Sequence, residues 1–146
     1  MICILRLAHQ LNCAYEYEKL VSEPLSSPMK VKDYVRRKLG CQEVECFHVL
    51  FLDTQNKIID SQQFGMGGVS QNAIPLNEVI REAIILRASA LICVHNHPSG
   101  KVDPSIEDIN ITQKLENMLE VMDVRLHDHL IASPTEVYSI KMKACV

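Results

Sequence analysis

The chain has 146 residues, of which 47% are hydrophobic and 23% charged, and this length and composition are those of one globular domain. The formal net charge of −3 lacks the strongly basic balance of a DNA-binding domain, so charge does not support a nucleic-acid partner. No apolar run approaches the roughly 18 residues of a membrane span. The positively charged start of a secretory signal is also missing, so we expect a cytoplasmic protein with no membrane partner.

Sequence patterns divide the chain into a short N-terminal segment, residues 1–26, which ends in a loop-like stretch, and a domain over residues 27–146. Apolar runs, polar turns and prolines at first helical positions predict the regular elements of this domain. They are a helix over 28–39, strands over 45–53 and 57–64, a helix over 75–89, a strand over 90–95, a helix over 105–121 and strands over 124–133 and 136–140. This order predicts an α/β fold, a mixed sheet flanked by helices.

Helical spacing also predicts which side chains of the two later helices face the core. They are Val79, Ile80, Ala83, Ile84, Ile109, Leu115, Met118 and Leu119. The six cysteines contain no CxxC pair, so we expect buried or free thiols. Residues 65–73, GMGGVSQNA, form a glycine-rich loop without the spacing or the GK[ST] ending of a phosphate-binding loop.

The stretch from 95 to 109, HNHPSGKVDPSIEDI, carries the clearest chemical signal. His95 and His97 follow a buried strand and project to the same side if the backbone stays extended. Asp108 falls in the first turn of the helix that Ser105 begins as N-cap. Two imidazoles and a carboxylate, with one position left for water, form the ligand set of catalytic zinc. The alternative is a polar loop followed by a Ser105–Asp108 capping box.

The pattern HxH-x7-S-x2-D resembles the JAMM metal motif of the MPN/JAB superfamily. The longer string HNHPSG, the later DHLI at 128–131 and the strand FHVLFLD resemble its RadC-like branch, over about residues 26–140. The resemblance implies the MPN fold, whose sheet is similar to that of cytidine deaminases. The deaminases' own metal motif needs a later PCxxC, which this chain lacks.

This resemblance implies a zinc-dependent hydrolase, a metalloprotease or isopeptidase of JAMM type, acting on a peptide or protein substrate. The implied metal ligands are His95, His97 and Asp108. The implied general acid and base is Glu45, with Glu43 as the reserve candidate because strand parity does not separate the two. Ser105 is implied to donate a hydrogen bond to the oxyanion through a hydroxyl hydrogen that its capping role leaves free.

Three neighbouring groups are candidates for supporting roles. Asp128 and His129 match the family's DH pair, and we expect one of them to support the ligands from behind or to pack at a strand end. His127 and His129 also form a second H-x-H pair. Cys93 shares the expected ligand face, but a buried thiol is the favoured interpretation.

A second function class stays open, a non-catalytic zinc-binding or partner-binding module associated with DNA repair or mobile elements. Structural zinc takes four protein ligands, so a fourth from Cys93, His127 or His129 would favour it.

Residues 1–14 do not resemble the helical DNA-binding region that precedes the domain in RadC-like proteins. Asn77 stands near the place of an arginine found in many relatives. The substrate and a homodimer through a strand edge also stay open.

Overall fold

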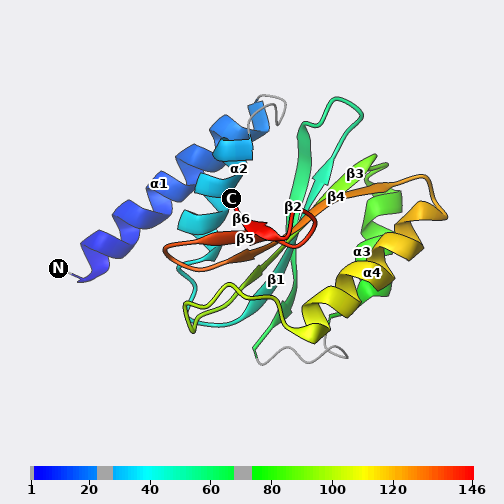
Figure 1. Cartoon of the computed structure of the whole chain (residues 1–146). Helices are drawn as coiled ribbons and strands as arrows, with labels where there is room; N and C mark the ends of the chain where they lie inside the picture. Colours follow the sequence, from blue (N-terminus) through cyan, green and yellow to red (C-terminus); the bar gives the residue numbers. More distant parts are fainter. Residues whose placement is uncertain (1, 23–27, 68–73) are drawn as a thin grey trace.

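The computed structural model describes residues 2–22, 28–67 and 74–146. A six-stranded mixed sheet in the order β2-β1-β3-β4-β5-β6 forms its centre, as the α/β expectation requires (Figure 1). The helices are α1 (Ile2–Ser22), α2 (Pro28–Tyr34), the π-helical turn η1 (Val35–Leu39), α3 (Leu76–Ile85) and α4 (Ile106–Glu120). The strands are β1 (Cys46–Leu52), β2 (Ile58–Met66), β3 (Ala90–Asn96), β4 (Arg125–Ala132), β5 (Val137–Ser139) and β6 (Ala144–Cys145).

Helices cover both faces of the sheet. Residues of α2 and η1, among them Val31 and Val35, pack on one face with Leu50 of β1, and we call this the α2 face. Residues of α3 and α4, such as Val79 and Leu115, pack on the other, which we call the α4 face. All seven residues of β1 and of β3 are buried, because both strands lie between these two layers.

Several boundaries differ from the sequence expectation. Most of segment 1–26 is the helix α1, which we did not predict, and β6 was also missed. Strand β2 continues through Met66, so the first two residues of the expected glycine-rich loop are strand; residues 68–73 of that loop lie outside the described residues. Helix α3 ends at Ile85, before the predicted residue 89, because Leu86 is its C-cap and Arg87 has the left-handed backbone angle φ = 52°.

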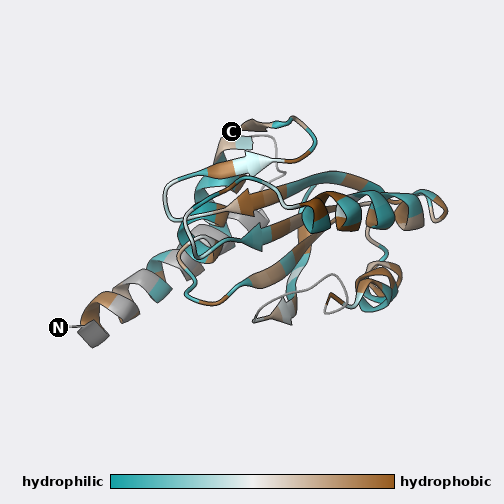
Figure 2. Cartoon of the chain, turned by 60° about the horizontal axis from the view of Figure 1, so that its bottom comes forward, coloured by the Kyte–Doolittle hydropathy of each residue, from teal (hydrophilic) through white to brown (hydrophobic). Residues whose placement is uncertain are grey.

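Two predicted core positions are wrong. Ile84 is 59% exposed and Ile109 is 49% exposed, whereas Ile111 is buried on the sheet side of α4. The face of α4 that packs on the sheet is therefore displaced from the predicted one. Figure 2 shows hydrophobic and hydrophilic residues alternating around this helix, as expected for a helix with one buried side.

A β-bulge in β4 decides which side chains reach the α4 face. Strand β3 pairs with β4 in parallel, and the register shifts so that Leu91 is opposite Leu126 but Ile92 is opposite Asp128. The extra residue, His127, changes the parity of the strand. Leu126 and His129 consequently both face α4, although they are three residues apart.

No helix among the described residues is long and apolar enough to cross a membrane.

Candidate metal centre

His95 and His97 lie at the end of β3 with their ring centroids 5.0 Å apart. His95 is the buried member, and His97, one residue beyond the strand, is partly exposed. The His97 Nδ1 atom is 2.9 Å from the Lys101 carbonyl oxygen. A carbonyl only accepts, so Nδ1 carries the hydrogen, and in the neutral ring the His97 Nε2 lone pair faces the site.

Asp108 approaches both histidines from the first turn of α4. Its Oδ1 atom is 2.7 Å from His95 Nδ1, and its Oδ2 atom is 3.6 Å from His97 Nε2. Burial acts to raise the pKa of Asp108, but hydrogen bonds with His95, His97 and Ser105 outweigh burial and hold this pKa well below its usual range. The carboxylate in turn raises the pKa of His97. The site therefore contains an ionised carboxylate between two imidazoles.

Ser105 forms the capping box that the sequence offered as an alternative. Its Oγ accepts a hydrogen bond from the Asp108 N–H at 3.1 Å, and its own N–H donates to Asp108 Oδ2 at 2.8 Å. The Ser105 hydroxyl also donates to Asp108 Oδ2, at 2.7 Å. The hydroxyl hydrogen that we expected to be free is thus directed at Asp108. Capping fixes the carboxylate toward the histidines, so the two interpretations of this motif coexist.

Glu45 immediately precedes β1, and its Oε1 atom lies 3.0 Å from His95 Nε2. The approach falls outside hydrogen-bond geometry, so the buried His95 Nε2 has no hydrogen-bond partner within the described residues. Glu45, His95 and His97 offer ligand atoms that all lie within 4.8 Å of one another. Glu43 is exposed and belongs to no such group in the described part of the chain. Of the two candidate glutamates, geometry therefore favours Glu45.

Asn96, the middle residue of the H-x-H pair, holds Glu45 in this place, a role that we did not predict from the sequence. Its Oδ1 accepts the Cys46 N–H at 2.7 Å, and its Nδ2 donates to the Val44 carbonyl at 2.9 Å. The side chain is 1% exposed. The two bonds bracket Glu45 from either side along the backbone, so Asn96 ties the start of β1 to the end of β3.

His129 lies inside the site. Its ring stacks near that of His95, with centroids 6.5 Å apart, and meets the Phe47 ring edge at 5.5 Å. His95, Asp108 and His129 form a second group whose ligand atoms lie within 4.8 Å of one another. Burial lowers the pKa of His129 to about 3, so the ring is neutral at neutral pH. Its Nδ1 atom is 2.6 Å from Thr112 Oγ1.

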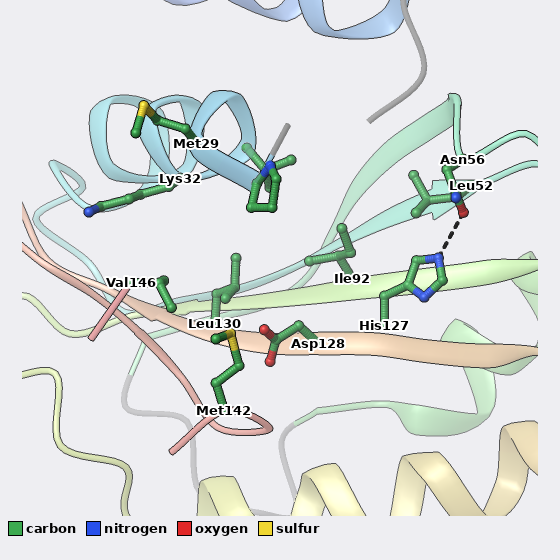
Figure 3. A pocket seen from close by; sticks show the side chains of 12 residues that line it. Met29, Lys32, Leu52, Asn56, Ile92, His127, Asp128, Leu130, Met142 and Val146 are labelled. Atoms are coloured by element: carbon green, nitrogen blue, oxygen red, sulfur yellow. Dashed lines mark hydrogen bonds between the residues drawn. The ribbon is translucent and has the colours of Figure 1, made fainter. Parts of the chain in front are cut away.

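Asp128 and His127 do not belong to the centre. Both line a pocket of about 480 Å³ on the α2 face, among the apolar side chains of Met29, Ile92 and other residues (Figure 3). His127 Nε2 bonds to Asn56 Oδ1 at 2.8 Å. Asp128 and His127 lie away from the centre because the bulge in β4 separates them from His129. The structure thus divides the DH pair between two faces and does not bring the second H-x-H pair together.

Cys93 lies on the ligand face, as its parity with His95 predicts, but inside the apolar cluster with Phe47 and Leu115. Burial raises the pKa of its thiol, so the neutral form is favoured. It belongs to no group of metal-ligating atoms in the described residues.

The donor set fits a metal ion. It combines imidazole nitrogens with carboxylate oxygens, which suit zinc and related transition metals. Two buried nitrogens, His95 Nε2 and His129 Nε2, have no hydrogen-bond partner within the described residues. Buried polar atoms rarely stay unpaired without a functional reason, and a metal ion would provide the missing partner.

Comparison with known proteins finds similar sequences over most of this chain. A UPF0758 protein of Chromobacterium violaceum is 41% identical over 113 residues, which are 77% of this chain and 50% of the relative. UPF0758 proteins of Burkholderia cenocepacia and Haemophilus influenzae are 39% and 36% identical, over 79% and 89% of this chain and 45% and 59% of their own length. The chain therefore spans about half the length of these relatives. Residues 25–145 match the model of the RadC-like JAB domain, and the chain belongs to this family.

Proposed function

We propose that this domain is a zinc-dependent hydrolase that cleaves peptide or isopeptide bonds. The observation that carries the proposal is the convergence of His95, His97 and Asp108 from two elements, with the Glu45 carboxylate 3.0 Å from His95 Nε2. A hydrolytic site needs ligands and a base on one side of the metal. A purely structural capping box explains Asp108 but gives no reason for Glu45 to approach His95.

Each residue has a distinct role in this proposal. His95, His97 and Asp108 would hold the zinc ion. When bound, zinc polarises the scissile carbonyl and lowers the pKa of water. Glu45 would take a proton from the attacking water and deliver it to the leaving amine.

Ser105 would donate a hydrogen bond to the developing oxyanion. Its hydroxyl hydrogen must first leave Asp108 Oδ2, 2.7 Å away. Rotation about the Cβ–Oγ bond is sufficient for this change, because the hydrogen bond that Oγ accepts from the Asp108 N–H uses an oxygen lone pair and not the hydroxyl hydrogen.

The first test is the zinc content of protein purified without a histidine tag. We expect about one zinc ion per chain in the wild type and its loss in His97→Ala. The second test uses Glu45→Gln, with Glu43→Gln as a matched control on the same segment. Glu45→Gln should keep zinc but lose hydrolysis of a peptide and isopeptide library, whereas Glu43→Gln should keep both. Equal hydrolysis by Glu45→Gln and the wild type would contradict the assigned base.

A further inference from the structure

Thr112 determines which nitrogen of His129 carries the hydrogen. The Thr112 hydroxyl donates to the Asp108 carbonyl oxygen at 2.6 Å, one turn earlier in α4. A hydroxyl has a single hydrogen to donate, so Thr112 Oγ1 must accept in its 2.6 Å contact with His129 Nδ1. The hydrogen therefore lies on His129 Nδ1, and in the neutral ring Nε2 presents a lone pair.

This lone pair is buried and unpaired. His129 is 1% exposed, and Nε2 has no hydrogen-bond partner within the described residues. His95 and Asp108 place their own ligand atoms within 4.8 Å of that of His129. A buried histidine whose Nδ1–H is held by an oxygen, and which offers a ligand atom close to those of an imidazole and a carboxylate, has the usual arrangement of a metal ligand.

We infer that His129 Nε2 is a further protein ligand of the metal held by His95 and Asp108. The inference rests on the proposed metal site and extends its ligand set beyond the motif. His97 offers its ligand atom in a separate group with Glu45 and His95, so it joins His129 on one ion only after its ring moves. All four protein ligands together would fill a tetrahedral zinc ion, and one of them must then leave before water or substrate can bind. The domain would then hold its metal tightly in a closed resting state and open it only for reaction.

The variant His129→Asn removes Nε2 and keeps a donor in the place of Nδ1–H, so it tests the role of Nε2 alone. An asparagine amide occupies the place of Nδ1–H and can still donate to Thr112, while the atom corresponding to Nε2 is gone. We expect zinc affinity, measured by competition with a chelator, to fall more than about tenfold. The matched control is His127→Asn, on the same strand but facing the other way, which should bind zinc as the wild type does. Unchanged affinity in His129→Asn would overturn the inference.

Thr112→Val tests the support of the ring. Valine keeps the shape of threonine but removes the oxygen that accepts from His129 Nδ1. Loss of such an outer hydrogen bond weakens metal binding by about 10- to 100-fold in other sites, and we expect the same range here. A Thr112→Val protein with wild-type zinc affinity would count against ligation by His129.

The wild-type protein gives an answer even if these variants fail to fold. With histidine ¹⁵N labelling and ¹¹³Cd in place of zinc, each ligating nitrogen is split by coupling to cadmium. The His129 ring is assigned through its contacts with Phe47 and Thr112. A split His129 Nε2 resonance supports the inference, and an unsplit one overturns it. This readout does not depend on hydrolysis. A split resonance in a protein that shows no peptidase activity in the library assay would therefore reject the proposed function and keep the inference.

Discussion

Two buried histidines, His48 and His129, have opposite surroundings. His48 on β1 faces the α2 side of the sheet, and His129 on β4 faces the α4 side. Each has an unpaired Nε2 within the described residues. Burial lowers the pKa of both, to about 4 for His48 and to about 3 for His129. They differ in their charged neighbours, which are Lys38 for His48 and Asp108 for His129.

This difference shows why an unpaired imidazole does not by itself define a site. His48 belongs to no group of metal-ligating atoms among the described residues, and a nearby lysine opposes any further positive charge. His129 has a carboxylate and a second imidazole beside it, which would attract a cation. The same buried group is therefore an unpaired histidine beside a lysine on one face and the proposed metal ligand on the other.

Removing the carboxylate should make the surroundings of His129 resemble those of His48. We expect Asp108→Asn to weaken zinc binding roughly a thousandfold, about 4 kcal/mol, because the site loses its buried charged ligand. Isothermal titration of zinc into the metal-free protein measures this directly. Asn keeps an oxygen near the Ser105 N–H, so the helix cap is largely retained.

Asp128→Asn is the matched control for this change. Asp128 accepts hydrogen bonds from the Ser139 hydroxyl at 2.6 Å and from the His129 N–H at 2.8 Å, on the opposite face. We expect its zinc affinity to match the wild type, with only a loss of stability. Equal zinc losses in the two variants would mean that the separation of the two faces by the bulge in β4 has no bearing on metal binding.

The second prediction concerns acid stability. The pKa of His48 is about 4 in the folded chain, against 6.5 for an ordinary histidine. Above pH 6.5 both states are neutral and the full stability is present. As pH falls toward 4, His48 binds a proton in the unfolded chain but stays neutral in the folded chain. The free energy of unfolding should drop by up to about 3 kcal/mol over this window.

His48→Leu separates this effect from other titrating groups. Urea unfolding at pH 7 and pH 4.5 should show a smaller acid-induced loss in the metal-free variant than in the metal-free wild type. Zinc affinity at pH 7 should be unchanged, because His48 is not part of the centre. An identical acid-induced loss in both proteins would show that His48 is not the group responsible.

The third prediction concerns Asn96, which joins β1 to β3. Asn96→Ala leaves the buried Cys46 N–H without its 2.7 Å acceptor. A buried donor without a partner costs about 1–3 kcal/mol, so we expect the unfolding free energy to fall by about 2 kcal/mol. The variant should still bind zinc, while hydrolysis falls further than stability explains because Glu45 is no longer held. Full hydrolysis in the folded variant would contradict this positioning role.

The sequence predicted the proximity of these side chains where local signals were strong. The apolar run before His95 and the N-cap at Ser105 fixed one strand end and one helix start, and these bring His95, His97 and Asp108 together. Strand parity could not place His129, because the bulge at His127 depends on pairing with β3. Asn96 was missed because an amide between two histidines has no pattern of its own; its bonds cross some fifty residues of chain.

The smallest expected effect concerns Ser105. Ser105→Ala removes the oxygen that accepts from the Asp108 N–H, and loss of such an N-cap costs about 1 kcal/mol. Thermal unfolding of the metal-free protein should show this loss, and Ser105→Thr should restore most of it because threonine also caps. If Ser105 only caps, hydrolysis by the zinc-loaded Ser105→Ala protein stays near that of the wild type. A selective fall in kcat, restored by threonine, is the outcome that the oxyanion role requires.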